Sequence, residues 1–319
     1  MAERFEDGFA GRVAVVTGGG TGMGRELVRQ LSADGCDVAT CDVLIDNAEQ
    51  TRAICEADGN PGDVLTFAAD VSDEAQVQAF ATAVGAWRPH VNLLFNNAGI
   101  GAAGTIVDGD RALWEKVFDI CWFGVYYNTL AFLPQLLRAP VGALVNTSSV
   151  NGFFASVGPD TPHSAYSAAK FAVKGFTEAL ITDFRLNAPH LRAAVVMPGH
   201  IGTSIAANTD KLLGMYDDLA KMRARYEAFG RDASKLSDDE LVARMARRGD
   251  AFRDSAPTTA AQAAAIILDA VRHDQWRILV GEDAHIIDEM VRENPVDAYT
   301  EDFYRDWLGR ISAARRSQS

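Results

Sequence analysis

Short apolar runs alternate with segments of helical length along the first two hundred residues. The runs are RVAVVT, CDVATC, VLTFAA, VNLLFN, GALVNTS and LRAAVVM. Each run is continuously apolar, which is typical of strands that are covered on both faces of a sheet. Strands that alternate with helices in this way predict an α/β fold, a doubly wound parallel sheet with helices on both faces. The run RILVG at 277–281 predicts one more strand.

Residues 204–256 follow these strands with a charged segment of helical periodicity. Its apolar positions recur at intervals of one, three or four and are Met215, Tyr216, Leu219, Met222, Tyr226 and Phe229. The pattern predicts a helix with one apolar face, which either packs on the body or partly faces a ligand as a lid. We expect a single domain over 1–319, with a helical substrate lobe at 204–256 and a helical C-terminal extension at 282–319.

Composition and charge favour a small-molecule partner. Thirty basic and forty-three acidic side chains give a net charge of -13, which argues against a surface that attracts nucleic acid or anionic lipid. The N-terminal MAERFEDGFAGR carries acidic residues where a secretion signal would have a basic start, and no stretch has membrane-spanning length. We therefore expect a soluble, cytoplasmic protein with no nucleic-acid or membrane partner.

The four cysteines do not indicate a metal site. Cys36, Cys41, Cys55 and Cys121 lack the short paired spacings of zinc sites and redox motifs. We expect them to be reduced and mostly buried, and we expect no metal.

A glycine-rich turn, TGGGTGMG, follows the first predicted strand and leads into a helix that begins near Arg25. Glycines at 18, 22 and 24 allow the backbone to turn tightly and to approach a pyrophosphate, to which the helix N-terminus offers free amide groups. A tight connection without a ligand is the simpler alternative. The position of the turn between a strand and a helix favours the phosphate site.

Asp42 closes the second predicted strand, twenty-four positions after Gly18. A carboxylate there can accept hydrogen bonds from an adenosine ribose and repels a 2'-phosphate. This favours NAD as the cofactor over NADP, since the glycine turn contains no Arg or Lys and Val43 follows the acid. A solvated aspartate at a strand end is the alternative.

Tyr166 and Lys170 are four residues apart in YSAAK, on one face of a predicted helix. A nearby ammonium stabilises phenolate over phenol, so we expect the pKa of Tyr166 to fall from about 10 toward neutrality. The tyrosine could then exchange a proton with an alcohol. Such pairs also occur by chance on ordinary helices, so the position of the pair in the fold decides whether it is catalytic.

Five motifs in order resemble the short-chain dehydrogenase/reductase family. They are TGGGTGMG, NNAG at 96–99, NTSS at 146–149, YSAAK at 166–170 and PGHIGT at 198–203. The resemblance covers about 8–203 and resumes at 257–281, and it implies a Rossmann fold. It also implies a homodimer or homotetramer, formed through the apolar helices at 111–137 and 166–187.

The resemblance implies that Tyr166 is the acid/base, that Lys170 is its electrostatic partner and a ligand of the nicotinamide ribose, and that Ser149 binds the substrate oxygen. Ser148 is the less favoured serine, because the family serine usually precedes a segment like Val150 to Gly152. The implied cofactor-binding residues are Gly18, Thr21, Gly22, Met23, Gly24, Asp42, Asp70, Val71, Asn97, Ala98, Gly99, Tyr166, Lys170, Pro198, Gly199, Ile201 and Thr203.

Two departures from the family pattern affect the site. Cys121 occupies the position of an asparagine that helps a water chain to connect the lysine to solvent, and a thiol cannot replace a carboxamide. Asn128 is a distant substitute, and a small core residue is the other interpretation of Cys121. The interval between Ser149 and Tyr166 is also longer than usual, and it supplies further candidate contacts. These are the substrate contacts Phe153, Phe154 and His163.

The expected reaction is the interconversion of a secondary alcohol and a ketone with NAD. Trp122, the two phenylalanines and the Met/Tyr stripe of the insert indicate a bulky apolar or aromatic substrate. For His163 and His200, a structural or solvent-exposed role is the alternative. An NAD-dependent epimerase or lyase that uses transient oxidation and a weakly active NAD-binding regulatory protein are the alternative functions.

Overall fold

The centre of the protein is a seven-stranded, all-parallel sheet. The computed structural model describes residues 5–101, 104–107, 109–228 and 231–317. In sheet order the strands are β3 (Val64–Ala68), β2 (Asp37–Asp42), β1 (Val13–Thr17), β4 (Leu93–Asn96), β5 (Gly142–Thr147), β6 (Leu191–Pro198) and β9 (Arg277–Val280). The doubly wound sheet predicted from the apolar runs is confirmed. Its strand order reverses between β1 and β4, where such sheets bind ligands.

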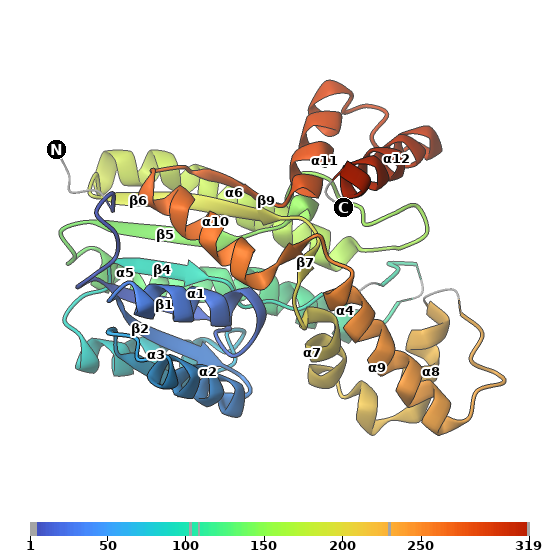
Figure 1. Ribbon diagram of the computed structural model, residues 1–319, viewed down its shortest axis with the longest axis horizontal. Helices are drawn as coiled ribbons and strands as arrows, with labels where there is room; N and C mark the ends of the chain where they lie inside the picture. Colours follow the sequence, from blue (N-terminus) through green and yellow to red (C-terminus); the bar gives the residue numbers. More distant parts are fainter. Residues whose placement is uncertain (1–4, 102–103, 108, 229–230, 318–319) are drawn as a thin grey trace.

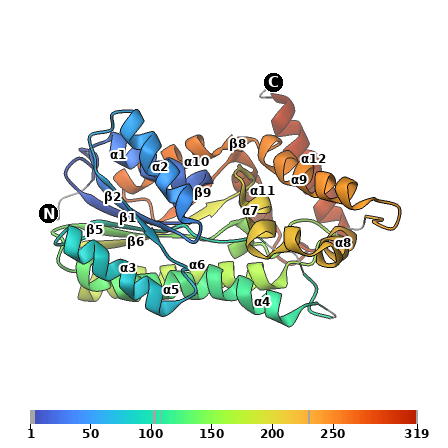
Figure 2. The same cartoon turned by 90° about the horizontal axis from the view of Figure 1, so that it is seen from below.

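Helices cover both faces of the sheet (Figures 1 and 2). On one face lie α1 (Gly22–Ala33), α2 (Ile45–Ala57) and α10 (Ala260–Arg272). On the other lie α3 (Glu74–Trp87), α4 (Arg111–Phe118), α5 (Gly124–Leu136) and α6 (Ser164–Asn187), with a π-helical turn, η1 (Asp119–Phe123), between α4 and α5. Alternate residues of β1 enter the two opposite cores, Val13 and Val15 one, Ala14 and Val16 the other. This explains why the strand is apolar throughout.

The insert forms a lobe that projects from one end of the body (Figure 1). Its elements are α7 (Ile205–Leu212), η3 (Met215–Asp217), α8 (Leu219–Ala228) and α9 (Asp238–Asp254), and a short pair, β7 (Ile201–Gly202) with β8 (Thr258–Thr259), lies at its base. Met222 and Tyr226 are buried in a core that belongs to the lobe itself. Tyr216 and Leu219 are more than a third exposed. Two residues of the predicted stripe therefore pack inside the lobe, and Phe229 lies outside the described residues.

The C-terminal extension consists of α11 (Glu282–Glu293) and α12 (Glu301–Ser317), as the sequence predicts. The two helices pack together beside the end of the sheet (Figure 1) and meet residues 150–154, which form the 3-10 turn η2 (Val150–Gly152) and the start of the following loop. The boundary of a single domain stays a prediction.

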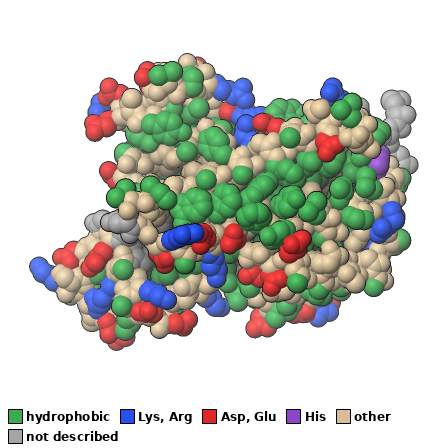
Figure 3. Space-filling view, turned by 180° about the vertical axis from the view of Figure 1, so that it is seen from behind, with side chains coloured by type: hydrophobic (Ala, Val, Ile, Leu, Met, Phe, Trp, Pro, Cys, Tyr) green, Lys and Arg blue, Asp and Glu red, His purple; other side chains and the backbone are tan. Residues whose placement is uncertain are grey.

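One face of the molecule is broadly apolar. Figure 3 shows hydrophobic side chains gathered on the side where α5 and α6 lie. Trp122 and Tyr126 contact Phe176 of α6 through their rings, and Phe171 and Leu130 are 43% and 46% exposed.

The described residues contain no helix that is both long enough and apolar enough to cross a bilayer. They also contain no cluster of three or more His, Cys, Asp or Glu side chains arranged to hold a metal ion.

Candidate functional site

The glycine-rich turn joins the carboxyl end of β1 to α1 and needs glycine for two reasons. Gly18 and Gly22 have φ angles of +68° and +55°, which L side chains rarely adopt. A Cβ on Gly24 would lie 2.0 Å from the carbonyl oxygen of Gly18 and 2.6 Å from Asn97 Nδ2. The first turn of α1 thus packs directly on the loop, so the amide end of the helix faces the cleft.

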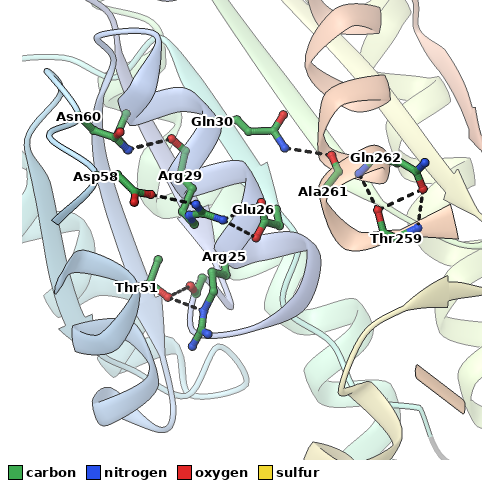
Figure 4. Close-up of polar contacts among 12 residues, drawn as sticks. Arg25, Glu26, Arg29, Gln30, Thr51, Asp58, Asn60, Thr259, Ala261 and Gln262 are labelled. Atoms are coloured by element: carbon green, nitrogen blue, oxygen red, sulfur yellow. Dashed lines mark hydrogen bonds and ion pairs between the residues drawn. The ribbon is translucent and has the colours of Figure 1, made fainter. Parts of the chain in front are cut away.

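Side chains from α1 and α2 fix the outer part of this turn (Figure 4). Arg25 Nε donates to the carbonyl of Gly20 at 2.9 Å, and Thr51 Oγ1 donates to the carbonyl of Gly19 at 2.9 Å. Sequence reasoning missed both residues. Arg25 lies next to the motif, but Thr51 reaches it from a helix that begins more than twenty residues later.

Asp42 ends β2 beside the turn, as its spacing predicts. One carboxylate oxygen accepts from the amide of Gly20 at 3.0 Å, and the other accepts from the amide of Leu44 at 3.0 Å. Burial raises the pKa of Asp42, although both amide bonds and Arg25 oppose this effect. The carboxylate therefore helps to shape the glycine turn in addition to facing the cleft.

Thr17 connects the ends of β1 and β4 at the point where the sheet reverses. Its hydroxyl accepts from the amides of Asn97 and Ala98, both at 3.0 Å. Asn97 Nδ2 returns a bond to the carbonyl of Thr17 at 3.1 Å. This exchange fixes the backbone of the NNAG motif against the glycine turn.

A cleft runs over these strand ends and collects most of the predicted cofactor residues. Those that line it are Gly18, Thr21, Gly22, Met23, Gly24, Asp42, Asp70, Val71, Asn97, Ala98, Gly99 and Thr203. Sequence reasoning missed several others, among them Asn47, Ile100, Lys116, Ile205, Asn208 and Leu212. Ile205, Asn208 and Leu212 belong to α7, the first helix of the lobe. Asn208 Nδ2 donates to Thr21 Oγ1 at 2.9 Å, which joins this helix to the glycine turn.

Pro198 ends β6, Ile201 begins β7, and Gly199 lies between them; all three are outside the lining of that cleft. The amide of Gly199 donates to Val280 of β9 at 2.9 Å, and the amide of His200 donates to Asp283 Oδ2 at 2.6 Å. A Cβ on Gly199 would lie 2.3 Å from the same carboxylate oxygen. Asp283, from the C-terminal extension, thus holds this loop, and no motif in the sequence pointed to it.

Tyr166 lies in the first turn of α6, with Lys170 one turn later. Lys170 Nζ lies 5.4 Å from the centroid of the Tyr166 ring and donates to the carbonyl of Thr147 at 2.8 Å. The Ser149 side chain acts on Tyr166 and lowers its pKa, whereas Ser148 Oγ donates to the carbonyl of Lys170 at 2.7 Å. The structure therefore groups Ser149, Tyr166 and Lys170, and it gives Ser148 a partner in the backbone of α6.

The protein's own groups do not lower the pKa of Tyr166 toward neutrality as expected; their net effect raises it. Burial raises the pKa of Tyr166, Cys121 raises it further, and the bond from Ser149 only partly opposes them. Burial also lowers the pKa of Lys170, because desolvation disfavours its charged form. The sequence argument was wrong here because it included the ammonium charge and left out the burial of both groups.

Cys121 lies in the π-helical turn and is buried next to Lys170. Its thiol donates to the carbonyl of Ile100 at 3.3 Å. A Cβ placed on Gly99 would lie 3.6 Å from both Cys121 Sγ and Lys170 Nζ. Asn128 is engaged within its own helix, where Nδ2 donates to Gly124 at 2.8 Å. Cys121 is therefore both a core residue and a neighbour of the lysine.

Both predicted phenylalanines after Ser149 pack toward the C-terminal extension. Phe153 is packed against the cluster of buried side chains there, and its role as a substrate contact stays a prediction. Phe154 is fully buried against the extension, with ring centroids 5.3 Å from Tyr299 and 5.7 Å from Trp307, so its prediction as a substrate contact is wrong. His163 stays beside the site, with its ring 4.9 Å from that of Tyr166. His200 packs on Phe252 of the lobe, with ring centroids 4.4 Å apart.

A parallel sheet with a glycine-rich turn after its first strand, and a serine, tyrosine and lysine at the same edge, is the organisation of a dinucleotide-dependent oxidoreductase. The family model described as short chain dehydrogenase matches residues 12–213. The chain belongs to the short-chain dehydrogenase/reductase family, as its motifs implied.

Three relatives show how far the similarity extends. SadH of Mycobacterium tuberculosis is 33% identical over 284 residues, covering 89% of this chain and 91% of that protein. Levodione reductase of Leifsonia aquatica is 34% identical over 206 residues, 64% of this chain and 75% of that enzyme. A solved short-chain dehydrogenase/reductase of Burkholderia phymatum in complex with NAD superposes with a TM-score of 0.71 at 29% identity, over 91% of this chain and 94% of that one.

Proposed function

We propose that the protein is an NAD-dependent oxidoreductase that interconverts a secondary alcohol and a ketone. The observation that carries the proposal is the group of Ser149, Tyr166 and Lys170 at the carboxyl edge of the sheet, next to the glycine turn. The similarity to levodione reductase and to a structure with bound NAD supports it. Fold alone would not, because one fold serves many reactions.

The chain's own residues fit a dinucleotide. The amide end of α1 would hold the pyrophosphate, since Gly24 leaves no room for a side chain between helix and turn. Asp42 would accept from the adenosine ribose, and Asp70 and Val71 would border the adenine. The loop from Pro198 to Thr203 would hold the nicotinamide end.

In oxidation, the Ser149 hydroxyl orients the substrate hydroxyl toward Tyr166, which accepts its proton as phenolate. Bound NAD would supply the redox chemistry, as the acceptor of the carbon-bound hydrogen with its electron pair. Lys170 lies beside the ring of Tyr166, where its charge favours the phenolate. Reduction of the ketone runs through the same steps in reverse.

The test is turnover of purified protein with NAD and a panel of aliphatic, aromatic and steroidal secondary alcohols, followed as NADH formation. We expect the best substrates among the bulky apolar or aromatic members. If NADH binds but no alcohol of the panel is oxidised, the proposal fails, and an epimerase, a lyase or a regulatory NAD-binding protein takes its place.

Asp42→Asn is expected to weaken the preference for NAD. The variant removes the charge that repels a 2'-phosphate but keeps an oxygen for the amide of Gly20. We expect the ratio of kcat/KM with NAD to kcat/KM with NADP to fall about tenfold or more, which corresponds to about 1.4 kcal/mol. A ratio equal to that of the wild type would show that Asp42 serves only the glycine turn.

Phe171→Glu is expected to dissociate a homodimer or homotetramer that forms through α5 and α6. Phe171 is 43% exposed on the apolar face, and a carboxylate buried against a second copy would lack a partner. Sedimentation should give a smaller species than the wild type, whereas the control Val296→Glu, at an 89% exposed site between α11 and α12, should not. Equal sizes for all three proteins would show that this face does not form the oligomer interface.

A cytoplasmic location stays a prediction.

A further inference from the structure

The loop that follows Ser149 is held by the C-terminal helix α12. Phe154 is fully buried in a cluster of aromatic side chains from the extension. Its ring centroid lies 5.3 Å from Tyr299, 5.6 Å from Phe303 and 5.7 Å from Trp307. Packing of this density fixes the loop at a point five residues from the candidate catalytic serine.

Two tyrosines add polar contacts to this packing. Tyr304 OH donates to Ser156 Oγ at 2.8 Å, and both residues are buried. Tyr299 OH accepts from the amide of Ala155 at 3.1 Å. A buried hydroxyl without its partner is costly, so the bond from Tyr304 restricts the positions that the loop can take, whereas the bond to Tyr299 is exposed.

Asn151 continues the chain of hydrogen bonds from this loop to the site. Its Nδ2 donates to the carbonyls of Phe154 and Ser156, at 3.0 and 2.9 Å, and its side chain is buried. Its backbone amide donates to Ser149 Oγ at 3.1 Å. The Ser149 side chain in turn acts on Tyr166 and lowers its pKa. The hydrogen bonds therefore run from α12 to Ser149, the neighbour of the proposed acid/base.

We propose that α12 is a working part of the site and that Tyr304 is a positioning residue, which acts through Ser156 and Asn151 to hold the Ser149 hydroxyl toward Tyr166. This inference rests on the proposed function for its catalytic consequence, but the link itself is a property of the folded chain. A purely structural extension would only cover the apolar ring of Phe154.

Tyr304→Phe separates these two roles, because it removes the hydroxyl and keeps the ring against Phe154. Trp307→Phe is the matched control, since it alters the same aromatic cluster and leaves the bond from Tyr304 to Ser156 intact. Ser156→Ala removes the same bond from the other side, together with the bonds of Ser156 Oγ to the amide and carbonyl of Gly158, both at 3.1 Å. If the bond is the link, Tyr304→Phe should have no further effect when it is added to Ser156→Ala.

We expect amide hydrogen exchange over 150–158 to be faster in Tyr304→Phe than in the wild type and in Trp307→Phe. With the best alcohol, kcat should fall about three- to tenfold in Tyr304→Phe, while the affinity for NADH stays unchanged. Trp307→Phe should keep the wild-type kcat and show only a lower Tm.

The dependence of the oxidation rate on pH distinguishes a positioning role of Tyr304 from a purely structural one, because a purely structural role would leave it unchanged. The bond from Ser149 lowers the pKa of Tyr166, so a displaced serine should shift the rise of oxidation with pH to higher pH. The other groups that face Tyr166 are Lys170, Cys121 and His163, and none of them changes in these variants.

Faster exchange in Tyr304→Phe with a wild-type kcat and pH profile would overturn the catalytic part of the inference, and unchanged exchange would overturn the link. If the wild type itself oxidises no alcohol, the proposed function fails separately. The exchange experiment then still decides whether α12 holds the loop at Ser149.

Discussion

Tyr166→Phe is expected to lower kcat for alcohol oxidation by about 10²–10⁴-fold, the range that a positioned acid/base contributes. The variant keeps the ring next to Lys170 and His163 and loses only the hydroxyl that exchanges the substrate proton. NADH affinity, measured by fluorescence titration, should stay near the wild-type value. Turnover at several pH values gives the rate effect.

The pH dependence of the wild type should follow from the same group. Because burial and Cys121 raise the pKa of Tyr166 among the protein's own groups, the phenolate fraction and the oxidation rate should increase as the pH rises. Tyr226→Phe, which removes a hydroxyl that accepts from Arg244 within the lobe, is the matched control and should keep the wild-type rate. If Tyr166→Phe oxidised the alcohol as fast as this control, Tyr166 would not be the base.

Gly24→Ala is expected to raise the dissociation constant for NADH by at least about tenfold, because the glycines of this turn permit the close approach of helix, loop and pyrophosphate. The added Cβ would lie 2.0 Å from the backbone oxygen of Gly18, so the turn or the start of α1 must shift. Calorimetric titration with NADH measures the effect.

Gly309→Ala provides the control for this substitution. A Cβ at Gly309 in α12 meets no atom within 4 Å, and alanine favours helix over glycine. It should bind NADH like the wild type and unfold at the same or a higher temperature. Equal NADH affinity in Gly24→Ala would contradict the assignment of the turn as the pyrophosphate site.

The sequence predicted the sheet well, because burial on both faces makes its central strands continuous apolar runs. Val13–Thr17 and Gly142–Thr147 are buried throughout. The pair of Ile201–Gly202 with Thr258–Thr259 was not predicted, since two residues carry no periodicity. The lobe was predicted as helical, but the burial of Met222 and Tyr226 within the lobe itself depends on contacts between α8 and α9.

The site was predictable where local motifs follow strand ends and was not where distant segments meet. Asp42 follows from its spacing, whereas Thr51 and Asp283 reach the site from elements that carry no motif. Phe154 was wrongly placed because its neighbours come from the C-terminal extension, about 150 residues later in the chain. The pKa of Tyr166 depends on burial, which the spacing of Tyr166 and Lys170 cannot give.

The central claim is that this chain moves a hydride between an alcohol carbon and NAD. The most direct test supplies the best secondary alcohol with deuterium on its carbinol carbon and analyses the NADH by mass spectrometry. We expect labelled NADH and an unlabelled ketone from the wild type, and both at a rate about 10²–10⁴-fold lower from Tyr166→Phe. Conversion of the alcohol to another product without labelled NADH in solution would contradict it.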